Sequence, residues 1–395
     1  MTNDEESPNA QMTKEHLDDS NRHSDFVQPS QSSALARIPS SLSSPLIAAT
    51  HAQLAELLEK IEPTARVAVD TEADSLHCYR EKLCLLQISV PSGDFIVDPL
   101  ADVDLAPLRE SLERKEIVLH GADYDLRMLR RGVSFTAREI FDTVIAARLL
   151  GIREFSLAAM VKRYFGIELP KGSQKANWAQ RPLPKRMAEY AINDTHYLLP
   201  LSEKLETELD RHHRLDWFRQ SCGRAIEQAA VERDRNEDEL WRIRGAGALR
   251  GRAAAVLRAL WQWREKEAAA VDRPAFHILQ NHELISSAEA FVAGATPDYR
   301  HFSERRRRTF CDAAKYALQL PAEDWPVLQR RSGPRPSAEI LRRTEKMRQR
   351  RDQAAKELGL EPAFVASRGT LESIAANQSR AEKVLVPWQR ELLGV

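Results

Sequence analysis

The chain has 395 residues, enough for two or three domains and far too many for a peptide, a small disulfide scaffold or a lone binding motif. Apolar residues make up 43% and charged residues 29%, which is typical of a chain that folds over most of its length. The 58 basic and 58 acidic side chains cancel, so the overall charge does not indicate a nucleic-acid or membrane partner.

The sequence lacks the features that mark secreted and membrane proteins. The four cysteines form no CxxC pair, which argues against a disulfide framework or a zinc site. No apolar stretch approaches the length of a membrane span, and the acidic, polar start of the chain is unlike a signal peptide. We therefore expect a soluble, cytoplasmic protein without a membrane partner.

The first half of the chain indicates an α/β domain. Residues 1–45 end in a serine-rich segment that cannot bury enough apolar surface to fold, which predicts a disordered tail. The expected elements then follow in order: a helix at 51–61, strands at 66–73, 83–90 and 94–98, a helix at 105–114 and a strand at 117–120. From Tyr124 to about Arg214 only helical periodicity is visible. Early strands, late helices and long crossovers predict a mixed sheet covered by helices.

The second half of the chain has a helical pattern throughout. Short segments with Gly or Pro breaks predict one or two small helical bundles, and the breaks are at 245–247, 273–274, 296–297 and 333–334. The predicted parts are a tail at 1–45, an α/β domain at 46–220 and helical domains at 233–315 and 330–395.

Two carboxylates close a hydrophobic strand in the string VAVDTEA. Asp70 and Glu72 are two positions apart, so on a strand their side chains point to the same side. Burying two like charges costs free energy unless a cation neutralises them. The pair therefore indicates either a metal site or a strand end that has reached solvent, and the choice depends on partners elsewhere in the chain.

Candidate partners lie in two helical segments. In LHGADYDLRML, Asp125 lies in the first turns of the helix that follows a strand, at the sheet edge where α/β proteins bind ligands. Asp123 is the alternative there, and it is also well placed to be a helix N-cap. In EYAINDTHYLLPL, Tyr190 and Asp194 are four residues apart and share a helix face. Taken singly, this last pair also fits a surface carboxylate beside a tyrosine at the core edge.

Together these pieces resemble the DEDD family of 3′-to-5′ exonucleases, which has D-x-E on its first strand, a helical Asp in its second motif and Y-x-x-x-D in its third. The tyrosine marks the DEDDy branch. The longer strings LCLLQIS, HGADYDLRML and NWAQRPLPKRMAEYAINDTHYLLPL are similar to the ribonuclease D family, over roughly residues 46–220. LWQWREKEAAAVDRPAFHILQNHELISSAEA resembles the HRDC helical module that follows this nuclease, and RRDQAAKELGLEPAFVASRGTLESIA resembles a second, degenerate copy.

The resemblance implies a fold and a site. The exonuclease domain at 46–220 would be a ribonuclease H-like mixed-sheet α/β domain, followed by all-α HRDC-type domains. The site would hold two divalent ions, Mg²⁺ or Mn²⁺, with four carboxylates as hard oxygen ligands.

The resemblance also implies a role for each site residue. Asp70 would bridge both ions, Glu72 and Asp194 would complete the site that activates water, and Asp125 would hold the second ion, partly through water. Tyr190 would orient the water, because a phenol with a pKa near 10 is a poor base at neutral pH.

The function implied by the resemblance is that of a monomeric 3′-to-5′ exoribonuclease that releases nucleoside 5′-monophosphates. Its substrates would be RNA, chiefly tRNA precursors, together with other structured RNA. Two alternatives stay open. One is a DEDDy exonuclease acting on DNA, since the acids alone do not distinguish the two sugars. The other is a catalytically silent nucleic-acid-binding protein, although the intact set of acids and tyrosine counts against it.

The C-terminal quarter is basic. Residues 300–395 carry 20 Lys and Arg against 12 Asp and Glu, a surplus of eight positive charges. Its densest cluster is the run Arg305, Arg306, Arg307 and Arg308. Four consecutive arginines cover all sides of a helix, so at least two must face solvent. We predict contacts with RNA phosphates there, and a solvated helix face is the alternative.

Overall fold

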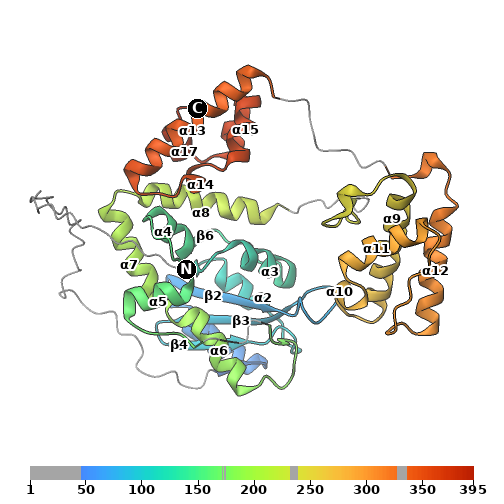
Figure 1. The fold of residues 1–395 in the computed structure, drawn as a ribbon. Helices are drawn as coiled ribbons and strands as arrows, with labels where there is room; N and C mark the ends of the chain where they lie inside the picture. Colours follow the sequence, from blue (N-terminus) through green and yellow to red (C-terminus); the bar gives the residue numbers. More distant parts are fainter. Residues whose placement is uncertain (1–45, 171, 173–174, 232–238, 327–335) are drawn as a thin grey trace, which may run out of the picture. The chain divides into compact units, whose positions relative to one another are not determined.

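The computed structural model describes residues 46–170, 172, 175–231, 239–326 and 336–395 (Figure 1). The tail predicted at 1–45 lies outside the described residues, and so does the break predicted at 333–334. Among the described helices, none combines the length and the apolar composition that a membrane crossing requires.

Six strands in the described part of the chain form one mixed sheet, in the order β1-β4-β3-β2-β5-β6. They are β1 (Leu46–Ala48), β2 (Arg66–Ala73), β3 (Leu83–Val90), β4 (Gly93–Val97), β5 (Glu116–Leu119) and β6 (Glu139–Asp142). β3 is antiparallel to both of its neighbours, whereas β1 with β4, β2 with β5 and β5 with β6 are parallel pairs. The predicted mixed sheet is therefore confirmed.

The prediction of helical periodicity alone after Tyr124 is wrong at β6. Glu139–Asp142 is a four-residue strand whose last three residues are buried. With four residues, of which only Ile140 and Phe141 are apolar, the strand is too short to show a two-residue alternation. It forms because Ile140 and its neighbours pair with β5 at the sheet edge.

Eight helices accompany the sheet within the described range 46–230. They are α1 (His51–Ile61), α2 (Ala106–Leu112), α3 (Asp123–Val133), α4 (Thr143–Leu149), α5 (Leu157–Phe165), α6 (Lys185–His196), α7 (Leu198–Arg211) and α8 (Leu215–Ala230). Local chemistry sets several boundaries, as in α1, where the Thr50 hydroxyl accepts a hydrogen bond from the backbone N–H of Gln53. α6 lies on one side of the sheet, and α4 and α8 lie on the other (Figure 1).

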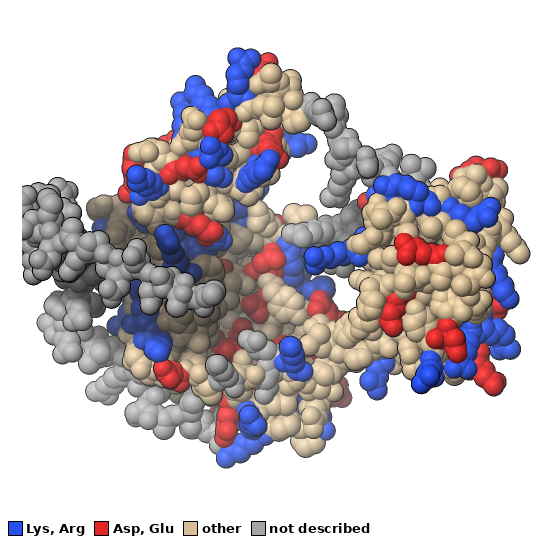
Figure 2. All heavy atoms as spheres, in the orientation of Figure 1, with Lys and Arg blue, Asp and Glu red and all other residues tan. Residues whose placement is uncertain are grey.

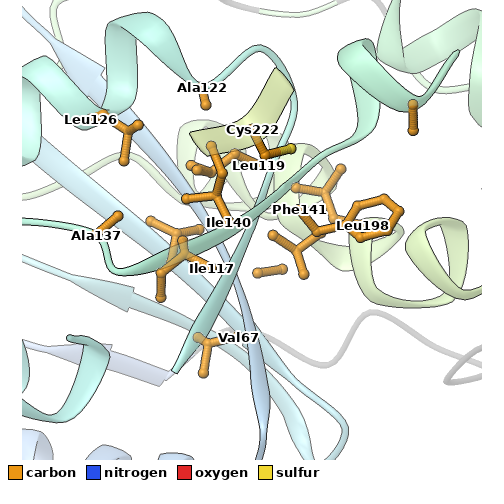
Figure 3. Packing of buried hydrophobic residues seen from close by; sticks show 14 of the residues in the cluster. Val67, Ile117, Leu119, Ala122, Leu126, Ala137, Ile140, Phe141, Leu198 and Cys222 are labelled. Atoms are coloured by element: carbon orange, nitrogen blue, oxygen red, sulfur yellow. The ribbon is translucent and has the colours of Figure 1, made fainter. Parts of the chain in front are cut away.

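The sheet contributes to two apolar clusters, and the larger one takes residues from both faces, such as the consecutive Val67, Ala68 and Val69. On one face Val67, Ile117 and Ile140 are register neighbours on three strands, and the larger cluster also contains helix residues such as Leu126 and Leu198 (Figure 3). The opposite face is covered by α6, and its cluster includes Leu85, Ile96, Met187, Ala188 and Ala191. This second face is the one that carries Asp70 and Glu72.

The remaining described chain is helical, which confirms the predicted all-α part. The first group consists of η2 (Ala246–Ala248), α9 (Gly251–Ala270), α10 (Ala275–Ile278), α11 (Asn281–Val292), α12 (Glu304–Leu318) and η3 (Ala322–Asp324). The second consists of α13 (Ala338–Leu358), α14 (Pro362–Val365), α15 (Arg368–Ala376), η4 (Gln378–Arg380), α16 (Ala381–Val384) and α17 (Pro387–Leu393). The boundaries 46–220, 233–315 and 330–395 stay predictions.

Candidate active site

Three acids meet where β2 ends. Asp70 and Glu72 share one face of the strand, and Asp194 reaches the same place from α6. One carboxylate oxygen from each of the three residues lies within 4.8 Å of the others. Among the described residues this is the only group of three or more His, Cys, Asp or Glu side chains close enough to hold a metal ion. The structure therefore brings the first and third predicted motifs together.

Asp125 is held beside this cluster by the residue between the two strand acids. Thr71 alternates to the opposite face of β2, where its backbone N–H and its hydroxyl both donate to Asp125 Oδ1, at 3.1 and 2.6 Å. Asp123 lies elsewhere: its side chain is 66% exposed and pairs with Arg127 at 2.9 Å. The N-cap interpretation of Asp123 is wrong, because α3 begins at that residue and Ala122 is the N-cap.

The start of α3 is fixed by a buried carboxylate on a neighbouring strand. Asp142 closes β6 and accepts backbone N–H groups from Gly121 and Ala122 at 3.0 and 2.8 Å. It also accepts the N–H of Val144 at 2.8 Å, which caps α4. Because Asp142 ties these two helix starts together, the turn that leads to Asp125 has little freedom.

The end of α6 is tied to the sheet by a polar network. The Ser89 hydroxyl lies 2.6 Å from Asp94 Oδ1 and 2.7 Å from the Thr195 hydroxyl. His196 Nδ1 lies 2.7 Å from the other oxygen of Asp94. The two residues of α6 that make these contacts follow Asp194 directly, so the contacts restrain the position of its carboxylate over β2.

Tyr190 lies one helical turn before Asp194 and is confined by the loop that precedes α6. Its ring stacks on buried Trp178, with the centroids 6.3 Å apart. Gly172 approaches the same ring so closely that a Cβ at this position would overlap it. The phenol is therefore held on the helix face that carries Asp194, as the Y-x-x-x-D spacing predicts.

The electrostatics of the cluster favour protons or cations. Burial raises the pKa of Asp70 well above its usual range, and the charges of the three other acids add to this effect. Burial and the charges of Asp194 and Asp125 raise the pKa of Glu72 to about 8. Burial and the charge of Asp125 raise the pKa of Asp194 to about 7. Burial raises the pKa of Asp125 to about 6, a rise that the hydrogen bonds from Thr71 oppose.

The predicted RNA-binding arginines lie at the start of α12, and acids neutralise part of the run. Arg305 and Arg306 both pair with Glu267, at 2.7 and 3.2 Å, and Arg307 pairs with Asp298 at 2.9 Å. Arg305, Arg307 and Arg308 are exposed, and Arg306 is partly buried. On the face shown in Figure 2, basic and acidic side chains are interspersed. The role of this run stays a prediction.

Comparison with known proteins identifies the family. Residues 45–210 match the 3′-5′ exonuclease family, and residues 253–291 match the HRDC domain. Ribonuclease D from Xanthomonas oryzae pv. oryzae is 30% identical over 355 residues, a match that covers 87% of this chain and 95% of that protein. The chain belongs to the ribonuclease D family. The family resemblance, the ribonuclease H-like exonuclease fold and the HRDC domain predicted from the sequence are thereby confirmed.

The same family fold is found in a solved structure. Escherichia coli RNase D superposes with a TM-score of 0.66 at 23% identity, over 89% of this chain and 97% of that one. Exosome complex component 10 from Mus musculus is 32% identical over 315 residues, which cover 73% of this chain. The chain spans about a third of the length of the exosome components that it matches.

Sequence reasoning did not find the residues that support the motifs. Thr71 lies between the two strand acids and Ser89 contacts Thr195 beside Asp194, yet neither belongs to a recognisable spacing. Alternation along β2 gives a signal for Thr71, because a residue between two site acids must face the other way. The link from Asp142 to the start of α3 shows no comparable signal, since the backbone groups that it joins there are about twenty residues away.

Proposed function

We propose that this ribonuclease D family protein is a 3′-to-5′ exoribonuclease that releases nucleoside 5′-monophosphates by hydrolysis at a site for two divalent cations. The observation that carries the proposal is the convergence of Asp70, Glu72 and Asp194 within 4.8 Å, with Asp125 beside them. Family membership supplies the reaction class, and the acids supply the means of performing it.

The acids fit divalent cations. Carboxylate oxygens are the ligands that Mg²⁺ and Mn²⁺ prefer. Within the described residues, none of the observed ion pairs joins a Lys or Arg to Asp70, Glu72 or Asp194, so these charges have no internal neutralising partner. Asp70 is the central residue, because the three other acids all act on its charge. Bound divalent cations would supply an activated water and stabilise the negative charge on the leaving 3′ oxygen.

The protein's own groups position the reactants. Tyr190 shares a helix face with Asp194 and would donate or accept a hydrogen bond with the attacking water. Trp178 and Gly172 limit the movement of the ring, so the hydroxyl keeps one orientation during turnover. Asp125, held by both donors of Thr71, keeps a fixed carboxylate near Asp70.

Structured RNA, with tRNA precursors foremost, is the proposed substrate class, and the proposed compartment is the cytoplasm. E. coli RNase D is described as an exoribonuclease involved in structured RNA processing, and its fold extends over 89% of this chain. The HRDC domain and the surplus of eight positive charges in residues 300–395 provide a further surface for the RNA body. We propose that the enzyme acts as a monomer.

A single assay tests direction, sugar and metal together. A 5′-labelled tRNA precursor with a 3′ extension and a DNA strand of the same sequence are incubated with the protein, with Mg²⁺ or with EDTA. We expect a ladder that shortens from the 3′ end of the RNA only when Mg²⁺ is present, with nucleoside 5′-monophosphates as products.

Two outcomes would replace the proposal. Equal digestion of the DNA strand would favour a DNA-directed exonuclease, and binding without hydrolysis would favour a silent nucleic-acid-binding protein. The Asp70→Asn protein, purified in parallel, controls for contaminating nucleases.

A further inference from the structure

Gln87 on β3 is an anomaly in the core of the exonuclease domain. Its side chain is 0% exposed, and within the described residues neither Nε2 nor Oε1 has a hydrogen-bond partner. A buried amide without partners lowers stability, whereas Met or Leu would fill a similar volume without that cost. An orphaned buried group in a native structure therefore needs an explanation.

The strand register places Gln87 next to the acid cluster. Gln87 is the direct cross-strand partner of Asp70 in the antiparallel pair of β2 and β3. Directly opposed residues point to the same face, with their Cβ atoms about 4.5 to 5.5 Å apart. The amide is thus the closest neighbour that β3 offers to the carboxylate of Asp70.

The helix above leaves the amide few other partners. Leu85, two residues before Gln87, packs with Ala188 and Ala191 of α6. Ser89, two residues after it, already bonds Thr195 of the same helix. Gln87 lies between these two contacts, so α6 covers it with apolar surface. Its lack of exposure also excludes direct contact with a substrate.

We propose that Gln87 is a positioning residue for Asp70, whose carboxylate accepts a hydrogen bond from Gln87 Nε2 when the divalent cations are bound. The inference rests on the proposed function, in which Asp70 is a ligand of the cations. A carboxylate that coordinates a metal ion can still accept hydrogen bonds with its remaining lone pairs, so Asp70 has room for one further donor. A neutral amide restrains the carboxylate without cancelling its charge, which a Lys or Arg at this position would do.

The test compares Gln87→Met with Ser111→Ala. The Ser111 hydroxyl on α2 is also buried and without a partner among the described residues, but α2 packs against α1 and lies outside the acid cluster. Melting temperature without metal, Mn²⁺ affinity by calorimetry, and kcat and KM on a short RNA are measured for both variants. Gln87→Leu repeats the test with a second apolar side chain, in case Met disturbs the packing.

Both variants should melt at or above the wild-type temperature without metal, because each removes an orphaned polar group. Only the Gln87 variants should lose Mn²⁺ affinity and kcat, by roughly 10- to 100-fold as for other groups that orient metal ligands, with KM little changed. The proposal would be overturned if the Mn²⁺ affinity and the kcat of the Gln87 variants both stay within about twofold of wild type. It would also be overturned if both Gln87 variants melt at a lower temperature with unchanged Mn²⁺ affinity, because the role of Gln87 would then be packing. A wild-type protein that binds Mn²⁺ but hydrolyses no RNA would refute the proposed function and leave the calorimetric test of Gln87 intact.

Discussion

The two ends of β2 carry charge in opposite ways. At its start, Arg66 donates to Glu116 through Nε and to Glu206 through both terminal nitrogens, at 2.6 and 3.0 Å. The hydrogen bond to Glu206 raises the pKa of Arg66 above its ordinary value. At its end, the charges that act on Asp70 and Glu72 are those of other acids, and the pKa values of both residues rise because of burial and repulsion.

The contrast distinguishes charges that stabilise the fold from charges that are available to bind a ligand. The partly buried charge of Arg66 has counter-ions supplied by the protein's own side chains. Where like charges are collected without a counter-ion, their repulsion costs stability and is relieved only by protons or by cations from solution. The contrast supports the proposed cation site at the end of β2 that carries Asp70 and Glu72, whereas the ion pairs of Arg66 at its start favour stability.

The largest effect on activity is expected from changing the end of β2 that carries Asp70 and Glu72. Asp70→Asn should reduce hydrolysis by at least about 100-fold, because the central carboxylate of the cation site is lost. RNA binding, measured by filter binding, should stay within a few-fold, since the basic surface is untouched. The variant should also melt at or above the wild-type temperature without metal, because one buried like charge is removed.

Asp123→Asn is the matched control for Asp70→Asn. It removes an exposed aspartate on α3 that pairs with Arg127, and it should hydrolyse RNA at nearly the wild-type rate. More than a tenth of wild-type activity in Asp70→Asn, or an equal loss in both variants, would contradict the assignment.

A smaller loss is expected at the tyrosine. Tyr190→Phe should lower kcat by roughly 10- to 1,000-fold while Mn²⁺ affinity changes little, because only a water-orienting hydroxyl is removed. Tyr164→Phe, which removes a hydroxyl that donates to Glu208 at 2.9 Å, should leave kcat unchanged. Calorimetry that shows Mn²⁺ binding weakened as much as kcat would refute this division of roles.

The sequence could predict the acid end of β2 but not the arginine end. Alternation in VAVDTEA indicates a strand that presents Asp70 and Glu72 on one side, and both features are local. Arg66 and its partners are 50 and 140 residues apart in the chain, so no local spacing reveals their network.

The same limit explains the other misses. β6 is too short for its period to be counted, and it is a strand only because β5 pairs with it. The Ser89 network joins residues about a hundred positions apart. Gln87, by contrast, is visible as one amide in the apolar string LCLLQISV, although its lack of partners among the described residues emerges only in three dimensions.

Removing the ion pairs of Arg66 at the start of β2 should change stability alone. Arg66→Met should lower the free energy of unfolding by about 1 to 3 kcal/mol, because Glu116 and Glu206 lose their charged donor. Mn²⁺ affinity and kcat of the folded protein should be unchanged. Arg114→Gln, which breaks an exposed pair with Glu62, should have almost no effect on denaturant unfolding. A loss of Mn²⁺ affinity in Arg66→Met would show that the two ends of β2 are not independent.

The smallest effect is expected at the basic run on α12. Changing exposed Arg307 and Arg308 to Gln should weaken RNA binding alike for different sequences, because phosphates carry no sequence information. For every phosphate that the variant no longer neutralises, the slope of log affinity against log salt should fall by roughly 0.7 to 0.9. If affinity and slope are unchanged, the arginine run is a solvated helix face without a role in RNA binding. A reduced melting temperature of the variant would show that the substitutions act through folding.

Mn²⁺ binding to the metal-free protein, measured by calorimetry from about pH 6 to pH 9, tests the central claim most directly. The raised pKa values, about 8 for Glu72 and about 7 for Asp194, mean that both carboxyls hold protons at the acidic end of this range. These protons must leave before the oxygens can coordinate a cation. We predict binding of two ions per chain, with an affinity that rises with pH to about 8, then levels, and is lost in Asp70→Asn. Affinity that is independent of pH, or binding that Asp70→Asn leaves intact, would contradict the assignment of the acid cluster to the cations.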